Sequence, residues 1–299
     1  MRRRMGASPN NSWLRANSSG RAWAVIERGF RTWKTGNWIV VLTGFFEPVF
    51  YLVAMGYGMS TLVGQVHGPG GVPMSYAAFV APAMMATSAM NGAIYDSTWN
   101  VFSKMRLSKI YQAMLATSLG PFDVAVGEIG MALFRGFVYA LGFTGVMAAL
   151  GLVSSWWALA MIPLALLIAL GFAAFGMAVT SYLTRFQQMD ILTLALMPMF
   201  LFSATMVPID VFPHGVQMFI MALPLWHGVE LMRQLSLGVF TQYAWVHLVY
   251  FVVLSVAGVW FTTTRLRSLF LRGKPAAEAS SPSAWMTFCS ICFANCELC

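Results

Sequence analysis

The chain has 299 residues, of which 59% are hydrophobic and only 9% are charged, and its formal net charge is +8. An average soluble domain carries roughly 25% charged residues, so this composition excludes a soluble protein and predicts an integral membrane protein. Net positive charge is also a feature of nucleic-acid-binding proteins, but here the Lys and Arg residues flank apolar segments. Anionic lipid headgroups are therefore the expected neighbours, and no nucleic-acid partner is expected.

The N-terminal part divides into a tail and a helix. Residues 1–20 are polar and rich in small side chains, so we expect a disordered cytoplasmic tail. In residues 21–36, apolar side chains such as Trp23, Ile26 and Phe30 recur at helical spacing, which predicts an amphipathic helix at the membrane interface. The helix either anchors the chain to the surface or also docks a cytosolic partner. The candidate docking residues are Glu27, Arg28 and Arg31.

Six apolar segments are long enough to cross a hydrocarbon core about 30 Å thick. They are residues 37–63, 75–94, 124–150, 156–182, 191–207 and 245–264. The apolar stretch 216–225, between the last two, is too short to cross and suits a re-entrant or interfacial helix. The expected fold is thus an all-α integral membrane protein, with one transmembrane domain over residues 37–264.

The Lys and Arg residues predict the topology. Eight precede the first span, three lie between the second and third, one lies between the fourth and fifth, and four follow the sixth. The positive-inside rule then places both termini of this multi-pass protein in the cytoplasm. No cleavable signal peptide is expected, because the arginine-rich start runs into polar residues. Arg135 and Arg233 do not fit this distribution and need their own explanation.

Three intramembrane polar residues are expected to face the interior of the bundle, since lipid cannot satisfy them. Glu47 precedes Pro48 in the first span, where it marks either a kink with a hydrogen-bonded acid or a proton relay. Glu128 and Arg135 lie seven residues, or two helical turns, apart in the third span. They occupy one face of that helix and are predicted to pair with each other.

Residues 96–121 form the longest predicted cytoplasmic connection between spans. Within it, the pattern of apolar residues predicts a short amphipathic helix from Lys104 to Thr117. Its basic residues Lys104, Arg106 and Lys109, together with Tyr111, are candidates for contact with a cytosolic partner.

A polar stretch follows the fifth span. Pro224-Leu225-Trp226-His227 precedes Glu230 and Arg233, between two apolar segments. A charged side chain in the bilayer costs roughly 2.5 to 3.5 kcal/mol on insertion scales, so these residues are predicted to lie in a structured, protein-covered loop.

Motifs for catalysis are absent from the sequence. The four His residues have no metal-ligand pair at i, i+4, and the sequence contains no phosphate-binding loop of the Gly-x-x-x-x-Gly-Lys-Ser/Thr type. We therefore expect neither an enzyme nor a bound cofactor, and any ATPase has to be another subunit. The cytoplasmic tail 265–299 ends in a C-x2-C-x3-C-x2-C pattern whose spacing is too tight for the usual zinc sites. These weak metal candidates are Cys289, Cys292, Cys296 and Cys299.

Three stretches resemble the ABC-2 type membrane permeases, and within them the branch of nodulation lipo-oligosaccharide and drug-resistance exporters. The first combines Glu47-Pro48 with Gly56-Tyr57-Gly58, and the second runs from Tyr111 to Glu128. The third and most specific contains Pro208, Pro213 and Pro224-Leu225-Trp226-His227 with Arg233. It matches the family signature of Pro, an apolar residue, any residue, His, five residues and Arg.

The resemblance implies a six-span permease that forms a dimer, and we expect the dimer to contain two copies of this chain. It also implies two cytosolic ATP-binding subunits, which hold ATP and Mg, and export of an amphipathic substrate. On this basis the N-terminal helix and the helix from Lys104 would couple ATP hydrolysis to the spans. Pro208, Pro224, His227, Glu230 and Arg233 would shape an exit segment, with Arg233 near headgroups or an anionic substrate group.

Two other classes of protein remain open. An ion-coupled secondary transporter would also lack a nucleotide site, but it predicts interior acids in several spans and internal repeats, whereas Glu47 is the main acid and no repeat is clear. A membrane-embedded enzyme would need clustered carboxylates or His residues. Asp96 and Asp123 are too far apart in sequence to support one.

Overall fold

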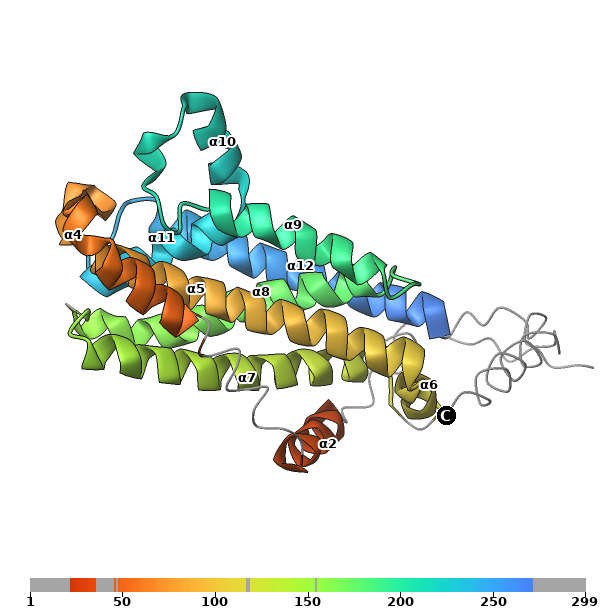
Figure 1. Ribbon diagram of the computed structural model, residues 1–299. Coiled ribbons are helices and arrows are strands. Elements are labelled where there is room, and N and C mark those ends of the chain that lie inside the picture. Colours follow the sequence, from red (N-terminus) through yellow and green to blue (C-terminus); the bar gives the residue numbers. More distant parts are fainter. Residues whose placement is uncertain (1–21, 36–45, 47, 117–118, 154, 271–299) are drawn as a thin grey trace, which may run out of the picture.

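The computed structural model describes residues 22–35, 46, 48–116, 119–153 and 155–270. Long helices lie side by side in a bundle and run alternately in opposite directions (Figure 1). These helices are α5 (Tyr76–Tyr95), α7 (Pro121–Ala149), α8 (Met161–Thr180), α9 (Gln188–Phe202) and α12 (Ala244–Phe270). The prediction of a helical membrane protein is therefore confirmed.

Among the described residues, four helical stretches are long and apolar enough to cross a membrane. They are Tyr76–Leu107, Pro121–Ala149, Trp156–Thr180 and Ala244–Leu269, and they correspond to the predicted second, third, fourth and sixth spans. The third of these stretches begins with the short helix η5 (Trp156–Ala160), which leads directly into α8.

The second span continues beyond its predicted end at Ile94. After α5 the chain forms two π-helical segments, η3 (Asp96–Asn100) and η4 (Ser103–Leu107), in one continuous helical stretch. The helix therefore continues through the first part of the connection that was predicted over residues 96–121. A charged residue at the end of an apolar run usually marks the membrane boundary, but here Asp96 is buried at 7% exposure against a partner on α7. The actual connection contains α6 (Ile110–Leu115), shorter than the helix predicted from Lys104 to Thr117.

The predicted first and fifth spans are not matched in full. In the first, residues 48–51 are helical and lead into η1 (Leu52–Tyr57) and α4 (Ser60–Val63), while Glu47 lies outside the described residues. The fifth is α9, which has 15 residues and ends at Phe202 rather than at Val207. A helix of that length spans only about 22 Å, less than the roughly 30 Å hydrocarbon core. The count of six spans is therefore not confirmed.

The segment predicted to be re-entrant consists of two helices, α10 (His214–Ala222) and α11 (Pro224–Leu237), that meet at Leu223. Pro224 begins α11, a position that suits proline because the first amide of a helix has no intrahelical partner. The short helix η6 (Ile209–Val211) precedes α10. Together with α4 these elements occupy one end of the bundle, and α10 projects from it (Figure 1).

A small β-hairpin at the same end was not predicted. Strands β1 (Gln65–His67) and β2 (Pro73–Ser75) pair antiparallel, with Gln65 opposite Ser75. The turn between them is η2 (Pro69–Gly71), where Gly70 and Gly71 adopt positive φ angles that favour glycine.

The core of the bundle surrounds α5, which packs against α7, α8 and α11. In its membrane-length window 83% of residues are buried inside the protein, whereas the corresponding value for α12 is 22%. The outer face of α12 presents large apolar side chains such as Trp245, Val253 and Trp260. Such a face is suited to lipid, since a helix that is apolar all round needs an apolar environment.

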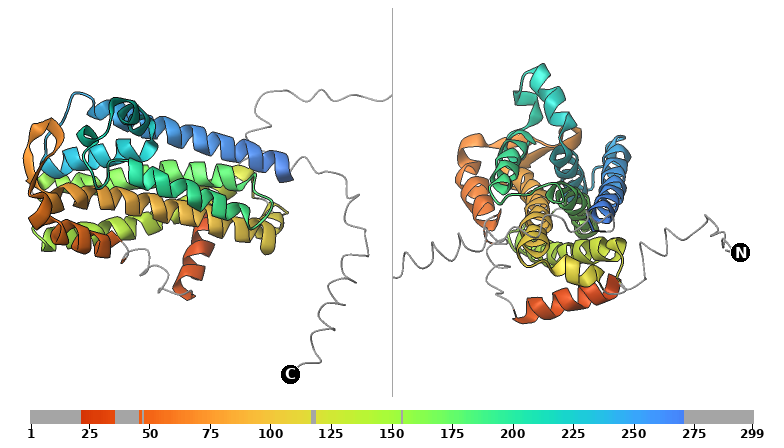
Figure 2. Two further views of the ribbon diagram at one scale, coloured as in Figure 1. Left: turned by 45° about the horizontal axis from the view of Figure 1, so that its top comes forward. Right: turned by 90° about the vertical axis from the view of Figure 1, so that its right-hand side faces the viewer.

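The predicted N-terminal amphipathic helix is present as α2 (Ala22–Thr35). It runs across the bundle axis and lies against α7, as the view along the bundle in Figure 2 shows. The predicted tail 1–20 and the four cysteines, Cys289, Cys292, Cys296 and Cys299, lie outside the described residues.

Candidate functional site

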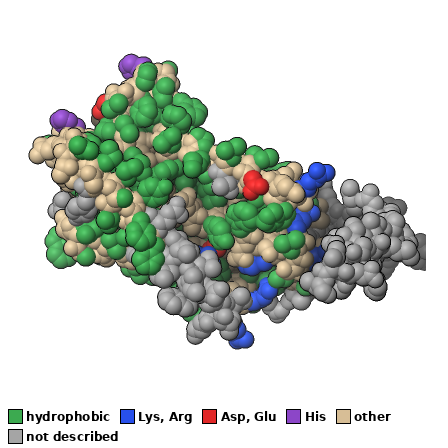
Figure 3. Space-filling view, viewed as in Figure 1, with side chains coloured by type: hydrophobic (Ala, Val, Ile, Leu, Met, Phe, Trp, Pro, Cys, Tyr) green, Lys and Arg blue, Asp and Glu red, His purple; other side chains and the backbone are tan. Residues whose placement is uncertain are grey.

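The basic side chains gather at the end of the bundle that contains α6, the start of α7 and the last turns of α12 (Figure 3). The distribution agrees with the side predicted from the positive-inside rule. At this end α5, through its continuation η3 and η4, contacts α7, and α2 and α6 pack on α7. We refer to this assembly of η3, η4, α6, the first half of α7 and α2 as the coupling region.

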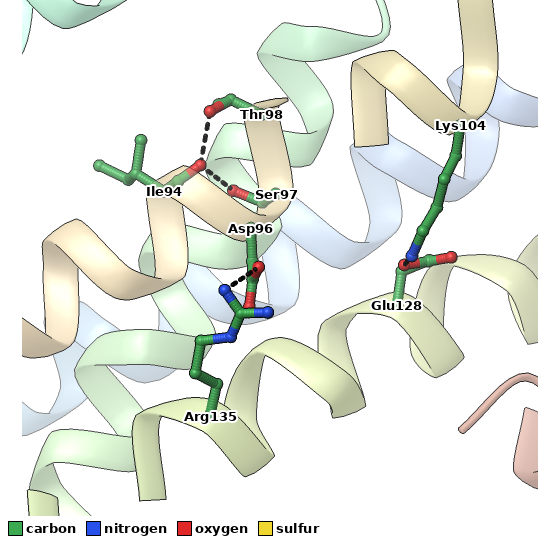
Figure 4. Close-up of polar contacts among 7 residues, drawn as sticks. All are labelled: Ile94, Asp96, Ser97, Thr98, Lys104, Glu128 and Arg135. Carbon is green, nitrogen blue, oxygen red and sulfur yellow. Dashed lines mark hydrogen bonds and ion pairs between the residues drawn. The ribbon is translucent and has the colours of Figure 1, made fainter. Parts of the chain in front are cut away.

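Two ion pairs join the extension of α5 to α7 (Figure 4). Lys104 Nζ lies 2.6 Å from Glu128 Oε2, and Arg135 Nη1 lies 2.9 Å from Asp96 Oδ1. Both carboxylates are buried, with 7% of each side chain exposed. Because the two helices are antiparallel, the order of the partners is reversed along them, and the pairs form two successive cross-links.

The predicted pairing of Glu128 with Arg135 is therefore wrong. The two residues do lie on one side of α7, but each finds its partner on the preceding helical stretch. Sequence reasoning missed Asp96 as a partner because it placed that residue in a loop. The available signal was an acid, Asp96, directly after an apolar run and a basic residue, Lys104, about two helical turns later.

The π-helical turns position these charges. In η3 the hydroxyls of Ser97 and Thr98 both donate to the carbonyl of Ile94, at 3.2 and 2.6 Å (Figure 4). These hydroxyl groups therefore place two side-chain donors on a carbonyl at the start of the widened turn. π-helical segments inside α-helices are frequent at functional sites.

Gly176 on α8 makes room for this widened turn. A Cβ added there would collide with the Ser97 side chain, so α8 approaches η3 closely because Gly176 has no side chain. The predicted third and fourth spans thus both contact the stretch that the sequence suggested was a loop.

The helix α2 docks on a face of α7 that carries glycines. A Cβ added at Gly127 would lie 2.5 Å from Val25 Cβ, and one at Gly130 would lie 3.1 Å from Ile26 Cδ1. The ring of Phe30 meets that of Phe134 edge to face, with centroids 5.5 Å apart. Apolar packing between complementary surfaces therefore holds α2 against the bundle.

The charged residues predicted for coupling lie around this contact. Glu27 and Arg31 are exposed and form an ion pair of 2.6 Å, while Arg28 Nη1 lies 3.9 Å from Met114 Sδ of α6. Arg106 and Lys109 are exposed, and Lys109 adopts a left-handed conformation with φ of 49° at the turn into α6.

Tyr111 differs from the other predicted coupling residues because it is fully buried. Burial, and next the negative charge of Glu128, raise the pKa of the Tyr111 phenol well above its usual range. The phenol therefore stays neutral, and its buried hydroxyl group has no hydrogen-bond partner within the described residues.

At the opposite end of the bundle, Arg233 lies on α11 and is 3% exposed. It donates from Nε to the Phe79 carbonyl at 3.2 Å and from Nη2 to the carbonyls of Ala204 and Thr205 at 2.6 and 3.1 Å. Its Cζ lies 3.6 Å from the centroid of the Phe79 ring. The predicted structured loop is thus a helix, and Arg233 is turned into the protein rather than toward headgroups.

The other residues of the predicted exit segment lie near this arginine in the chain but make different contacts. His227 Nδ1 lies 2.6 Å from His247 Nδ1 on α12, and its ring stacks on Tyr250 at 4.2 Å between centroids. Glu230 Oε1 accepts a 3.4 Å hydrogen bond from Gln234, and Pro208 leads into η6. The contact between His227 and His247 was not predicted, because twenty residues separate them in the sequence.

Within the part of the chain that the structure describes, no group of three or more His, Cys, Asp and Glu side chains could hold a metal ion. The four cysteines of the tail are not included in that search.

The chain is similar to known proteins over most of its length. Residues 21–237 match the family model described as ABC-2 type transporter. Nodulation protein J of Rhizobium leguminosarum bv. viciae is 33% identical over 217 residues, which cover 72% of this chain and 82% of the relative. Nodulation protein J of Rhizobium meliloti (strain 1021) is 29% identical over 236 residues, covering 78% and 85%.

The match begins at the N-terminal helix and ends within the last turn of α11, so it includes both the coupling region and the segment around Arg233. The chain belongs to the ABC-2 type transporter family.

Proposed function

We propose that this chain is the membrane-spanning permease subunit of an ATP-driven exporter. Two copies would combine with two cytosolic ATP-binding subunits, which hold ATP and Mg, in a bacterial plasma membrane with both termini of the permease in the cytoplasm. Family membership and the lack of a nucleotide-binding motif in the sequence support the proposal that a separate subunit hydrolyses ATP.

The observation that carries the proposal is the construction of the coupling region. Exposed charged residues on α2 and around α6 offer a surface to a cytosolic protein. Behind that surface, α2 and α6 are packed on α7, and α7 is joined by two buried ion pairs to the extension of α5. A displacement of α2 or α6 by a closing ATPase would therefore move two central helices together.

The substrate is proposed to be amphipathic, and an acylated oligosaccharide is the first candidate because the relatives are named as nodulation proteins. A hydrophobic drug is the second candidate. The segment with Pro208, α10 and α11 would re-enter the membrane from the far side and border the exit. In this arrangement Arg233 would stabilise the exit segment from inside rather than contact the substrate.

The first test is purification of the tagged chain in mild detergent, with identification by mass of the proteins that accompany it. A stoichiometric ATP-binding subunit with ATPase activity, and ATP-dependent transport after reconstitution, is the expected result. A chain that purifies without such a subunit and whose transport follows a proton or sodium gradient would instead establish the ion-coupled secondary transporter.

The coupling region is tested by reversing the exposed charges alone. The double variant Arg106→Glu/Lys109→Glu should assemble with the ATPase but transport substrate at least tenfold more slowly per ATP hydrolysed. Arg267→Glu, an exposed residue of α12 at the same end, is the matched control and should transport normally. Equal coupling in both variants would remove Arg106 and Lys109 from the mechanism.

A further inference from the structure

An apolar groove with a volume of about 560 Å³ lies between α8 and α12, on the outer surface of the bundle. Large side chains form its walls, among them Phe175 from α8 and Trp260 and Phe261 from α12. Trp260 is 68% exposed and Phe261 is 41% exposed, so the groove opens to the surroundings of the bundle. Its size falls within the roughly 300–1,000 Å³ of typical ligand pockets.

The groove lies beside a close contact between the two helices. At Gly258 an added Cβ would lie 2.8 Å from Ala174 Cβ, so the helices are in direct contact there. Gly258 also forms part of the groove, together with Ala178 and Ala257. Small residues at the floor and aromatic residues at the walls leave a channel that suits a narrow, flexible, apolar chain.

The positively charged side chain of Arg265 lies at one end of this groove. The ring of Tyr182, which lines the groove, stacks on Phe261 at 5.8 Å between centroids. The Cζ atom of Arg265 lies 4.2 Å from the centroid of the same ring. Arg265 follows Phe261 by four residues, about one helical turn toward the C-terminal end of α12.

The Nε atom of Arg265 is buried and has no hydrogen-bond partner within the described part of the chain. Arg135 and Arg233, the other arginines inside the bundle, have carboxylate or carbonyl partners. Arg265 differs from them in this respect. A guanidinium with free N–H groups is well suited to bind a phosphate through parallel hydrogen bonds. Arg185, which is exposed, adds positive charge at this end of the bundle.

We propose that this groove is a binding site for an anionic phospholipid from the leaflet at the α6 end of the bundle. An acyl chain would lie between α8 and α12, and the headgroup phosphate would take the free donors of Arg265. Basic pockets between transmembrane helices are known to bind anionic headgroups in this way. The site lies outside the coupling region and the exit segment, and the proposal does not depend on the transported substrate.

A second copy of the chain fits the groove less well than a lipid. A twofold contact through this face would bring Arg185, Arg265 and Arg267 toward their own equivalents, since a symmetric interface pairs the same surface with itself. A lipid offers both parts that the groove needs, an apolar chain and a negative charge at its end.

The test is native mass spectrometry of the full chain, purified in mild detergent and mixed with phosphatidylglycerol or with phosphatidylcholine of identical acyl chains. We expect the protein to retain phosphatidylglycerol at least threefold more often than phosphatidylcholine. Arg265→Gln should abolish this preference, and Arg265→Lys should keep part of it, because lysine retains the charge but not the planar fork. Arg267→Gln is the matched control and should retain the full preference.

The apolar part of the site is tested with Ala257→Trp, which should reduce retention of both lipids, and with Ala257→Leu as a milder variant if the first melts at a lower temperature. Equal retention of the two lipids by the wild type, or an equal loss in Arg265→Gln and Arg267→Gln, would overturn the proposal. The proposal would also be overturned if the Ala257 variants lost self-association but retained lipid as the wild type does. The groove would then be a contact between two copies.

Discussion

The two ends of the bundle hold their buried cations in different ways. In the coupling region, Lys104 and Arg135 each face a carboxylate on a neighbouring helical stretch. At the far end, Arg233 is held by three backbone carbonyls and an aromatic ring. A carboxylate side chain can rotate or exchange its partner, whereas a carbonyl moves only with its backbone. The contacts of the first end can therefore exchange through side-chain rotation alone, whereas those of the second change only if the backbone moves.

The largest effect is expected from removing the fixed connection. Arg233→Ala removes the donor shared by the carbonyls of Ala204 and Thr205, together with the bond to the Phe79 carbonyl in α5, and a buried acceptor without a partner costs roughly 1–3 kcal/mol. We expect the free energy of unfolding in detergent to fall by about 3 kcal/mol or more, and export to fall while membrane insertion persists.

Thermal unfolding of the purified variant measures this effect. Glu230→Gln, one turn away on the same helix and partly exposed, is the control and should melt close to the wild type. A melting temperature for Arg233→Ala equal to that of the control would mean that the three hydrogen bonds contribute little.

A smaller effect is expected in the coupling region, because the Lys104 side chain is 22% exposed and can reach water. Removing one partner of a fully buried ion pair costs about 3–5 kcal/mol, so we expect about 2 kcal/mol for Lys104→Gln or Glu128→Gln alone. The double variant Lys104→Gln/Glu128→Gln leaves neither charge unpaired and should lose less stability than the sum of the two single losses. Additive losses in this double-mutant cycle would show that the two side chains are not energetically coupled.

The close contact between η3 and α8 offers a steric test of the same region. Gly176→Ala adds a methyl group where the Ser97 side chain lies, and overpacking of this kind typically costs about 1–3 kcal/mol. We expect about 1 kcal/mol, since the π-helical turn can shift. Ser97→Ala in the same chain should relieve part of the loss, and thermal unfolding of the three variants distinguishes a local clash from a general defect.

The smallest effect is expected at the exposed ion pair of α2. Glu27 and Arg31 keep 50% and 78% of their side chains exposed, and such pairs contribute between 0 and about 1 kcal/mol. Glu27→Gln should leave the melting temperature nearly unchanged. Val25→Asp on the opposite face of α2, which packs on Gly127, should release the helix from α7, as increased proteolysis of the N-terminal segment would reveal.

Several parts of the structure were predictable from local patterns. The amphipathic period of residues 21–36 predicted α2 within one residue at each end, because a helix at an interface needs an apolar face. Long apolar runs predicted the helices α5, α7, α8 and α12, because a membrane-spanning helix satisfies its backbone groups internally. The missing catalytic and nucleotide motifs could likewise be read directly.

Other parts depended on neighbours that are distant in the chain. The acid at Asp96 suggested the end of a span, but Arg135 lies beside it in space and allows the helix to continue. Positions 128 and 135 suggested a pair within α7, yet both residues face the preceding helical stretch instead. The sequence pattern identified Glu128 and Arg135 as interior residues and could not identify their partners.

The sequence by itself determined the class of protein, most of the long helices and the end of the bundle at which positive charge collects, because these follow from hydropathy and helical period along one segment. Only the tertiary structure decided which charges pair, where α2 docks and how Arg233 is satisfied. Those contacts join side chains or carbonyls that lie 24, 102 and 154 residues apart, in the pair Lys104–Glu128, the contact Val25–Gly127 and the bond Arg233–Phe79. Such partners are fixed by the packing of antiparallel helices, and no local pattern contains that information.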